Sequence, residues 1–157
     1  MSRRIVLGVL IFVNLATIFF FSHQDAKTST AVSNAISHQI EIRTPDYAQK
    51  SLGEKNILHS NLQKRLRESA HTLLFFSLGI LLYFYIITYG KRWYLSALYT
   101  VGIGFLCALG DEFHQTFVPG RTAQWSDVGG DMLGILLSIV ILSPGVIVAF
   151  YQKTKKP

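Results

Sequence analysis

The chain has 157 residues, half of them hydrophobic and only 15% charged, and its mean hydropathy is positive. This composition excludes an ordinary soluble globular protein and is typical of the membrane class, while the length suits one compact domain. The net charge is +6, but the basic residues lie mainly at the edges of apolar segments, which argues against a nucleic-acid partner. The single cysteine, Cys107, excludes an internal disulfide bond and a cysteine-rich metal site.

The first predicted element covers residues 5–21, an apolar run preceded by Arg3 and Arg4. A basic start followed by an apolar run also occurs in secretory signal peptides. This run is longer than the hydrophobic region of a usual signal peptide, and no clear small-residue cleavage site follows it. We therefore interpret it as a retained first membrane span.

Residues 22–70 form a polar segment of mixed charge between the first and second spans. Two stretches within it, at 32–40 and 57–66, approximate amphipathic helices. Amphipathic segments next to membrane spans commonly lie in the membrane interface, and this is the arrangement we predict. The alternative is a solvated loop with nascent helices.

Three further apolar segments, at 72–89, 95–110 and 128–151, predict the second, third and fourth spans. Lys91 and Arg92 form a basic turn between the second and third spans. The sequence thus predicts an all-α integral membrane four-helix bundle with a polar extracytoplasmic segment between its first two spans.

The orientation of the bundle is predicted from its short basic segments, which carry most of the topological information. Residues 3–4, residues 91–92 and the C-terminal lysines fall on one side of an up-down-up-down path. We predict that this side is cytoplasmic, with both termini inside and with residues 22–70 and 111–127 outside. One basic group, residues 64–67, lies at the outer end of the second span and opposes this assignment.

The densest run of acids, amides and an arginine lies between the third and fourth spans. If the third helix continues to about residue 117, Asp111, Glu112 and Gln115 share an arc of about 100°, with His114 on its flank. Small residues at 104 and 108 lie below them on the same face.

The fourth helix repeats this arrangement, because one narrow face carries Asp127, Asp131, Gly134 and Ser138. Ser126 or Asp127 is the predicted N-cap, and Gly130 with Gly134 forms a small-x-x-x-small pattern. Because small residues permit close helix packing in membranes, we predict that the third and fourth spans pack closely together. That contact would gather four carboxylates at the outer membrane edge.

Four clustered carboxylates need compensating charge, because like charges raise one another's pKa. The candidate compensators are Arg121, after the Pro-Gly turn, and the pair Arg67 and His71 at the outer start of the second span. A hard cation such as Mg²⁺ or Ca²⁺ also suits an all-oxygen cluster. Arginine pairing alone is the alternative to a metal, and an exposed interfacial position is the alternative role for His114.

These polar residues follow one another in an ordered motif: Asp111-Glu112-x-x-Gln115-x-Phe117-x-Pro119-Gly120-Arg121, then Ser126-Asp127 and Asp131-x-x-Gly134. The motif resembles the signature of the VanZ-like membrane protein family. The resemblance extends to Phe20-Phe21-Ser22-x-Gln24, to Ser29 and Ser33, and to Ala70-His71. It therefore covers most of the chain, as a single VanZ-like domain at 1–157. The chain departs from the family pattern with Glu68, where a basic residue is common, and with Asp131, where Asn is common.

The resemblance implies a protein of the bacterial cytoplasmic membrane, and the family's namesake is associated with resistance to the glycopeptide teicoplanin. It does not supply a settled chemical activity. It transfers a functional role to Asp111, Glu112, Gln115, Arg121 and Asp127, and less directly to His71 and Asp131.

We therefore expect a polar pocket that binds or processes an amphiphilic envelope component, such as a lipid-linked or phosphorylated headgroup. Arginine suits the anionic group because guanidinium binds phosphate and carboxylate in a bidentate manner. The expected binding residues are Arg121, Gln115, Arg67, Asp131 and His114. The expected hydroxyl acceptors, metal ligands or general acid/base groups are Asp111, Glu112, Asp127 and His71.

Two other function classes remain open at this stage. One is a non-enzymatic membrane scaffold in which the buried polar network fixes helix packing. The other is a proton- or ion-coupled transporter, which fits less well because no acid lies near the middle of any span.

Overall fold

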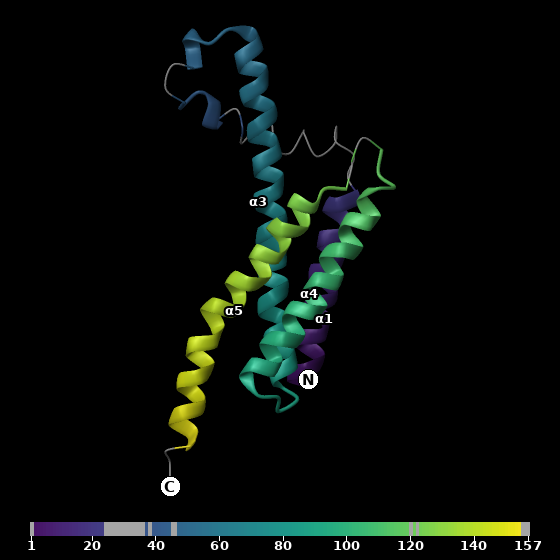
Figure 1. Ribbon diagram of the computed structural model, residues 1–157, viewed down its shortest axis with the longest axis vertical. Helices are drawn as coiled ribbons and strands as arrows, with labels where there is room; N and C mark the ends of the chain where they lie inside the picture. Colours follow the sequence, from purple (N-terminus) through teal and green to yellow (C-terminus); the bar gives the residue numbers. More distant parts are fainter. Residues whose placement is uncertain are drawn as a thin grey trace.

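The computed structural model describes residues 2–23, 37, 39–44, 47–119, 121 and 123–154. In these ranges the regular secondary structure is helical, with no strand (Figure 1). Four long helices are apolar enough to cross a membrane: α1 (Arg3–His23), α3 (Leu52–Ile87), α4 (Trp93–Gln115) and α5 (Trp125–Thr154). A short 3-10 helix, η1 (Tyr47–Gln49), precedes α3. The prediction of an all-α protein with four long apolar helices is confirmed.

Helix α3 is longer than its predicted span and begins twenty residues earlier. Ser51 is its N-cap, and a capping box joins the Ser51 side chain to the Glu54 backbone and the Glu54 side chain to the Ser51 backbone. Its 36 residues correspond to about 54 Å, well beyond the ~30 Å hydrocarbon thickness of a bilayer. The predicted interfacial helix at 57–66 is therefore wrong, because these residues extend the second span and project beyond the bundle (Figure 1).

The other predicted amphipathic stretch, at 32–40, lies largely outside the described residues. At its edge, Glu41 is buried against the projecting part of α3, where its carboxylate lies 2.5 Å from His59 Nδ1. The Tyr47 hydroxyl donates a longer hydrogen bond of 3.4 Å to the same carboxylate. These contacts attach the described end of the polar segment to α3.

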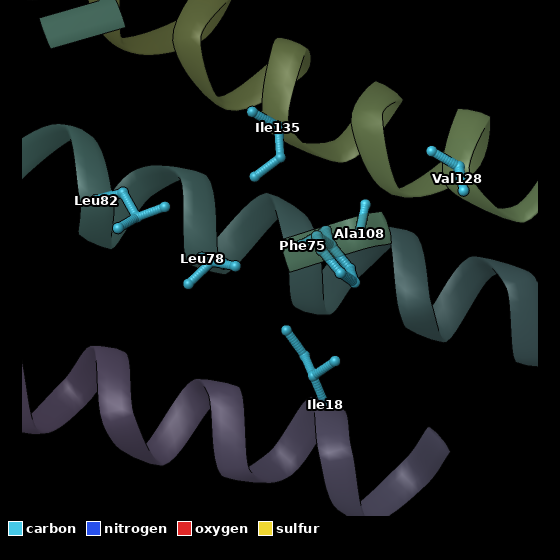
Figure 2. Packing of buried hydrophobic residues seen from close by; sticks show 7 residues of the cluster. All are labelled: Ile18, Phe75, Leu78, Leu82, Ala108, Val128 and Ile135. Carbon is cyan, nitrogen blue, oxygen red and sulfur yellow. The ribbon is translucent and has the colours of Figure 1, made fainter. Parts of the chain in front are cut away.

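Helix α3 packs against each of the other three long helices, as α4 also does, and its most extensive contact is with α5. The buried hydrophobic cluster is built around its side chains Phe75, Leu78 and Leu82 (Figure 2). Ile18 reaches this cluster from α1 and Ile135 from α5 (Figure 2). Many large apolar side chains on the outer helix faces stay exposed, among them Phe12, Leu98, Leu106 and Val140. Such extensive exposed apolar surface is what lipid-facing helices present.

The two ends of the bundle differ in character. At one end, Gly90 adopts a φ of +71°, which lets the chain turn sharply between α3 and α4. Arg4 donates a 2.7 Å hydrogen bond to the Thr88 carbonyl and lies 4.4 Å from the centre of the Tyr89 ring, so the basic start of α1 is attached to this turn. The opposite end, where α1 and α4 finish and α5 begins, carries the polar residues (Figure 1).

Candidate functional site

The acidic face of α4 is buried, as the helical spacing predicts. Asp111, Glu112 and Gln115 are each no more than 8% exposed and end the helix side by side. Asp111 is held on both oxygens: the Ser22 hydroxyl of α1 donates to Oδ1 at 2.5 Å, and Gln115 Nε2 donates to Oδ2 at 2.8 Å. Paired hydrogen bonds of this kind fix the position of a buried carboxylate.

Arg121 reaches this acidic face indirectly. Its Nη1 donates a 3.2 Å hydrogen bond to Gln115 Oε1, and its Nη2 donates a 3.4 Å hydrogen bond to the Phe21 carbonyl. Its Nε is buried without a hydrogen-bond partner, and no carboxylate in the described part of the chain forms an ion pair with it. The guanidinium is thus positioned by an amide and a carbonyl, and its charge is not neutralised by direct contact with an acid.

Three buried side chains from three helices converge next to this arginine. His71 of α3, Asp111 of α4 and Asp131 of α5 each offer one ligand atom, and these atoms all lie within 4.8 Å of one another. Their exposed fractions are 9%, 8% and 2%. His71 Nδ1 lies 3.7 Å from Asp111 Oδ2, beyond hydrogen-bonding distance, and His71 Nε2 is buried without a described partner.

A cavity of about 540 Å³ lies between α3, α5 and the segment that joins α4 to α5. Its charged and imidazole groups are Arg67, Glu68, His71, Arg121, Asp127 and Asp131. Leu73 and Leu133 also line it, and they are 66% and 53% exposed, so the cavity passes directly into the outer apolar surface of the bundle. The site therefore joins a charged wall to a lipid-facing rim.

Glycine brings α5 close to α3 at this cavity. A Cβ on Gly134 would lie 2.3 Å from the Thr72 carbonyl oxygen and 2.9 Å from the Phe76 nitrogen, so only glycine fits against the α3 backbone. The predicted role of the Gly130–Gly134 pair in bringing the third and fourth spans together is therefore wrong. The prediction that the third and fourth spans pack together is confirmed. Gly104 permits part of this contact, because the side chain of Ile135 from α5 occupies the space that a Cβ would fill.

The start of α5 also differs from the prediction. The helix begins at Trp125, so Ser126 and Asp127 lie in its first turn rather than at the N-cap. The Ser126 hydroxyl donates a 3.0 Å hydrogen bond to Asp127 Oδ1, and both residues line the cavity. An acidic side chain in the first turn still interacts favourably with the helix dipole.

Three of the predicted site residues do not line the cavity: Asp111, Glu112 and His114. Glu112 Oε2 accepts a 2.8 Å hydrogen bond from the Gln124 backbone N–H, so it holds the chain just before α5. His114 lies on the α1 side of α4, where its ring centre is 4.4 Å from that of Phe19 and its Nε2 is 3.4 Å from His23 Nδ1. Both roles proposed from the sequence stay predictions, but neither side chain contributes to the cavity wall.

The structure brings the remaining predicted residues together: Arg67, His71, Gln115, Arg121, Asp127 and Asp131 line the cavity, and Asp111 contacts two of them. Sequence reasoning assigned no role to Ser22, although Phe20-Phe21-Ser22 is part of the resemblance to the family. It also missed Ser69 and Thr72, which line the cavity and lie two residues before and one residue after His71.

Four membrane-capable helices around a buried polar cluster define a multi-pass membrane protein. The family model VanZ/LLP1 matches residues 7–149, which include all the residues of the site. The chain therefore belongs to the VanZ/LLP1 family, as the motif at 111–134 indicates. Neither the curated proteins nor the solved structures that were searched give a match.

Proposed function

We propose that this protein binds an amphiphilic envelope component and holds its phosphorylated or carboxylate headgroup in the cavity between α3 and α5. The observation that carries the proposal is the Arg121 guanidinium, which faces the cavity without a described carboxylate partner. A buried or half-buried guanidinium is costly unless it is paired, so an anionic ligand supplies the missing partner.

A second arginine strengthens the case for an anion. Arg67 lines the same cavity, and burial together with the repulsion from Arg67 lowers the pKa of Arg121. A phosphate between the two guanidinium groups would offset that repulsion and accept bidentate hydrogen bonds from each. The first turn of α5 also lies at the cavity and adds the positive end of a helix dipole.

The rim of the cavity indicates why the ligand is amphiphilic. Leu73 and Leu133 are more than half exposed on the outer surface of the bundle, next to charged groups of the cavity. A headgroup in the cavity therefore leaves its chain lying along these leucines in the bilayer. A fully soluble ligand would make no use of this surface.

His71, Asp127 and Asp131 face the same space and are groups that accept a proton or bind a hydroxyl. We propose that they contact the polar part of the headgroup, which allows processing as well as binding. If that headgroup belongs to a cell-wall precursor, the amount of this protein will alter glycopeptide susceptibility.

The test is a lipid-binding measurement on the full chain in phosphatidylcholine nanodiscs, with phosphatidic acid as the probe. Arg121→Lys keeps the charge but loses the bidentate geometry, and we expect binding to weaken about tenfold or more, because a charge-assisted hydrogen bond contributes about 1.5–3 kcal/mol. Arg92→Lys is the matched control, because Arg92 is exposed at the opposite end of the bundle and bonds only Tyr94. Asp127→Asn changes a second residue of the cavity lining, and we expect it to weaken binding as well.

Three results separate the alternatives. Equal binding by wild type and Arg121→Lys contradicts the proposal. Loss of folded protein with every substitution at the cavity, without any lipid retained by the wild type, favours the scaffold. Binding of inorganic phosphate as tightly as phosphatidic acid shows that the chain of the lipid contributes nothing, and removes the amphiphilic part of the proposal.

A further inference from the structure

The cluster of His71, Asp111 and Asp131 is built from one side chain on each of three helices. Their ligand atoms lie within 4.8 Å of one another, and all three residues are at least nine-tenths buried. Imidazole nitrogen and carboxylate oxygen are the donors that Zn²⁺ and neighbouring first-row divalent ions bind in proteins. Two donors about 2.0–2.2 Å from a tetrahedral zinc ion are on the order of 3.4 Å apart, close to the 3.7 Å between His71 Nδ1 and Asp111 Oδ2.

His71 supplies an observation independent of the acidic cluster. Its Nε2 is buried with no hydrogen-bond partner among the described residues, and its Nδ1 is too far from Asp111 for a hydrogen bond. Buried polar atoms nearly always find partners, so an imidazole left unpaired beside two buried carboxylates calls for a ligand. A divalent cation bound by His71 Nδ1 and the two carboxylates supplies a ligand to the imidazole through one of its two nitrogens.

The surroundings of Asp111 resemble the outer shell of a metal ligand. Ser22 donates to its Oδ1 and Gln115 to its Oδ2, and Arg121 in turn donates to Gln115. Such hydrogen bonds orient a coordinating carboxylate and leave a second lone pair on the oxygen that faces His71. Asp111 is thus fixed in place for coordination before any ion arrives.

The local charge also favours a divalent cation. The electrostatic environment of Arg121 contains Arg67 and the carboxylates of Asp111, Glu112 and Asp127, and Asp131 lies beside them. The site thus holds four carboxyl groups against two guanidinium groups. A divalent ion bound by Asp111 and Asp131 would offset the charge of the carboxylates that coordinate it, within a buried site where uncompensated charge is expensive.

We infer that His71, Asp111 and Asp131 bind a divalent transition-metal ion of the Zn²⁺ class, with its remaining coordination position open to the cavity. Three protein ligands and one open position are typical of zinc sites that act on a substrate. The imidazole distinguishes this donor set from the all-oxygen cluster for which Mg²⁺ or Ca²⁺ was expected. Contact between the ion and a phosphorylated headgroup rests on the proposed function, whereas binding of the ion itself does not.

The experiment uses the full chain in detergent, stripped with chelator, without added lipid, and titrated with Zn²⁺ alone. Bound zinc is measured after desalting, and Co²⁺ is substituted to record the visible absorption of a coordinated ion. We expect about one zinc per chain and a higher thermal midpoint. No retained zinc, and no absorption with Co²⁺, would overturn the inference.

Two near-isosteric variants locate the ion. Asp131→Asn and His71→Gln keep the side-chain size but each lose one ligand, and we expect stoichiometric zinc binding to be lost. His114→Gln is the matched control, because the His23–His114 pair places two imidazole nitrogens 3.4 Å apart and offers zinc a competing site. Zinc retained by His71→Gln but lost by His114→Gln would place the ion at that pair and contradict the proposal.

A positioning residue gives a readout in zinc affinity rather than in stoichiometry. Ser22→Ala removes a hydrogen bond to Asp111 without touching a ligand atom, and we expect zinc affinity to fall about tenfold with the same stoichiometry. Unchanged affinity in this variant counts against Asp111 as a ligand. If the protein binds lipid but not zinc, only this inference is contradicted. If it binds zinc but not lipid, only the proposed function is contradicted.

Discussion

The Ser22 hydroxyl donates a 2.5 Å hydrogen bond to Asp111 Oδ1, which joins the last turn of α1 to the last turns of α4 across 89 residues of sequence. Both groups are buried. Loss of the Ser22 hydroxyl would therefore leave the buried Asp111 Oδ1 with one hydrogen-bond partner fewer. Through this contact, the position of Asp111 in the site depends on the position of α1.

Replacing Ser22 by alanine is the first prediction. We expect the free energy of unfolding to fall by about 1–3 kcal/mol, because the lost bond involves a charged, buried acceptor. Fluorescence-detected thermal unfolding in detergent measures the effect. Ser60→Ala is the control, since the Ser60 hydroxyl donates only to the Ile57 carbonyl on an exposed face of α3. Equal stability of the two variants would contradict a structural role for the Ser22 bond.

The second prediction concerns the contact of Gly134 with α3. Gly134→Ala places a Cβ against the α3 backbone, which cannot move aside as a flexible side chain can. We expect a loss of about 1–3 kcal/mol in stability and weaker lipid binding, because the cavity between α3 and α5 changes shape.

Gly129→Ala is the matched control for that experiment. It lies on the same helix with nothing within 4 Å of the added Cβ, so its effect should be neutral or slightly stabilising. If both alanine variants behave alike, close packing of α5 on α3 does not shape the site.

The third prediction separates the structural role of Glu112 from a chemical one. Glu112→Ala removes the acceptor of the Gln124 N–H bond, and we expect hydrogen exchange at that amide to accelerate about tenfold or more. Glu54→Ala is the control, because the Glu54 carboxylate accepts its hydrogen bond from the Ser51 backbone N–H in the first turn of α3 and does not line the cavity. If the variant loses ligand binding while hydrogen exchange at the Gln124 amide is unchanged, Glu112 acts in the chemistry of the site and not in its structure.

The fourth prediction concerns orientation in the membrane. We predict that the basic end faces the cytoplasm, because Arg3, Arg4, Lys91 and Arg92 lie near or in the turn at that end. Alkaline phosphatase fused after residue 91 or after residue 157 should be inactive, and a fusion after residue 50 should be active. Activity at either of the first two positions means that the cavity opens to the cytoplasm.

Much of the site follows from helical periodicity. Residues 111, 112 and 115 share one face of any α-helix, and Asp127 and Asp131 share another, so their placement side by side on each helix needs no knowledge of the fold. The capping box of Ser51 and Glu54 was also present in the sequence. Read as a helix start, it would have predicted the long α3 in place of a separate interfacial helix.

The sequence by itself determined what is local: four apolar helices, a polar end, and the faces on which acids and small residues fall, because hydropathy and the helical repeat act over neighbouring residues. The tertiary structure alone decided the partners. It turned Gly134 toward α3 and Glu112 toward Gln124, and it brought Ser22 and His71 to Asp111. In a membrane every helix face is apolar enough to pack, so close steric fit and the pairing of buried polar groups choose the neighbours.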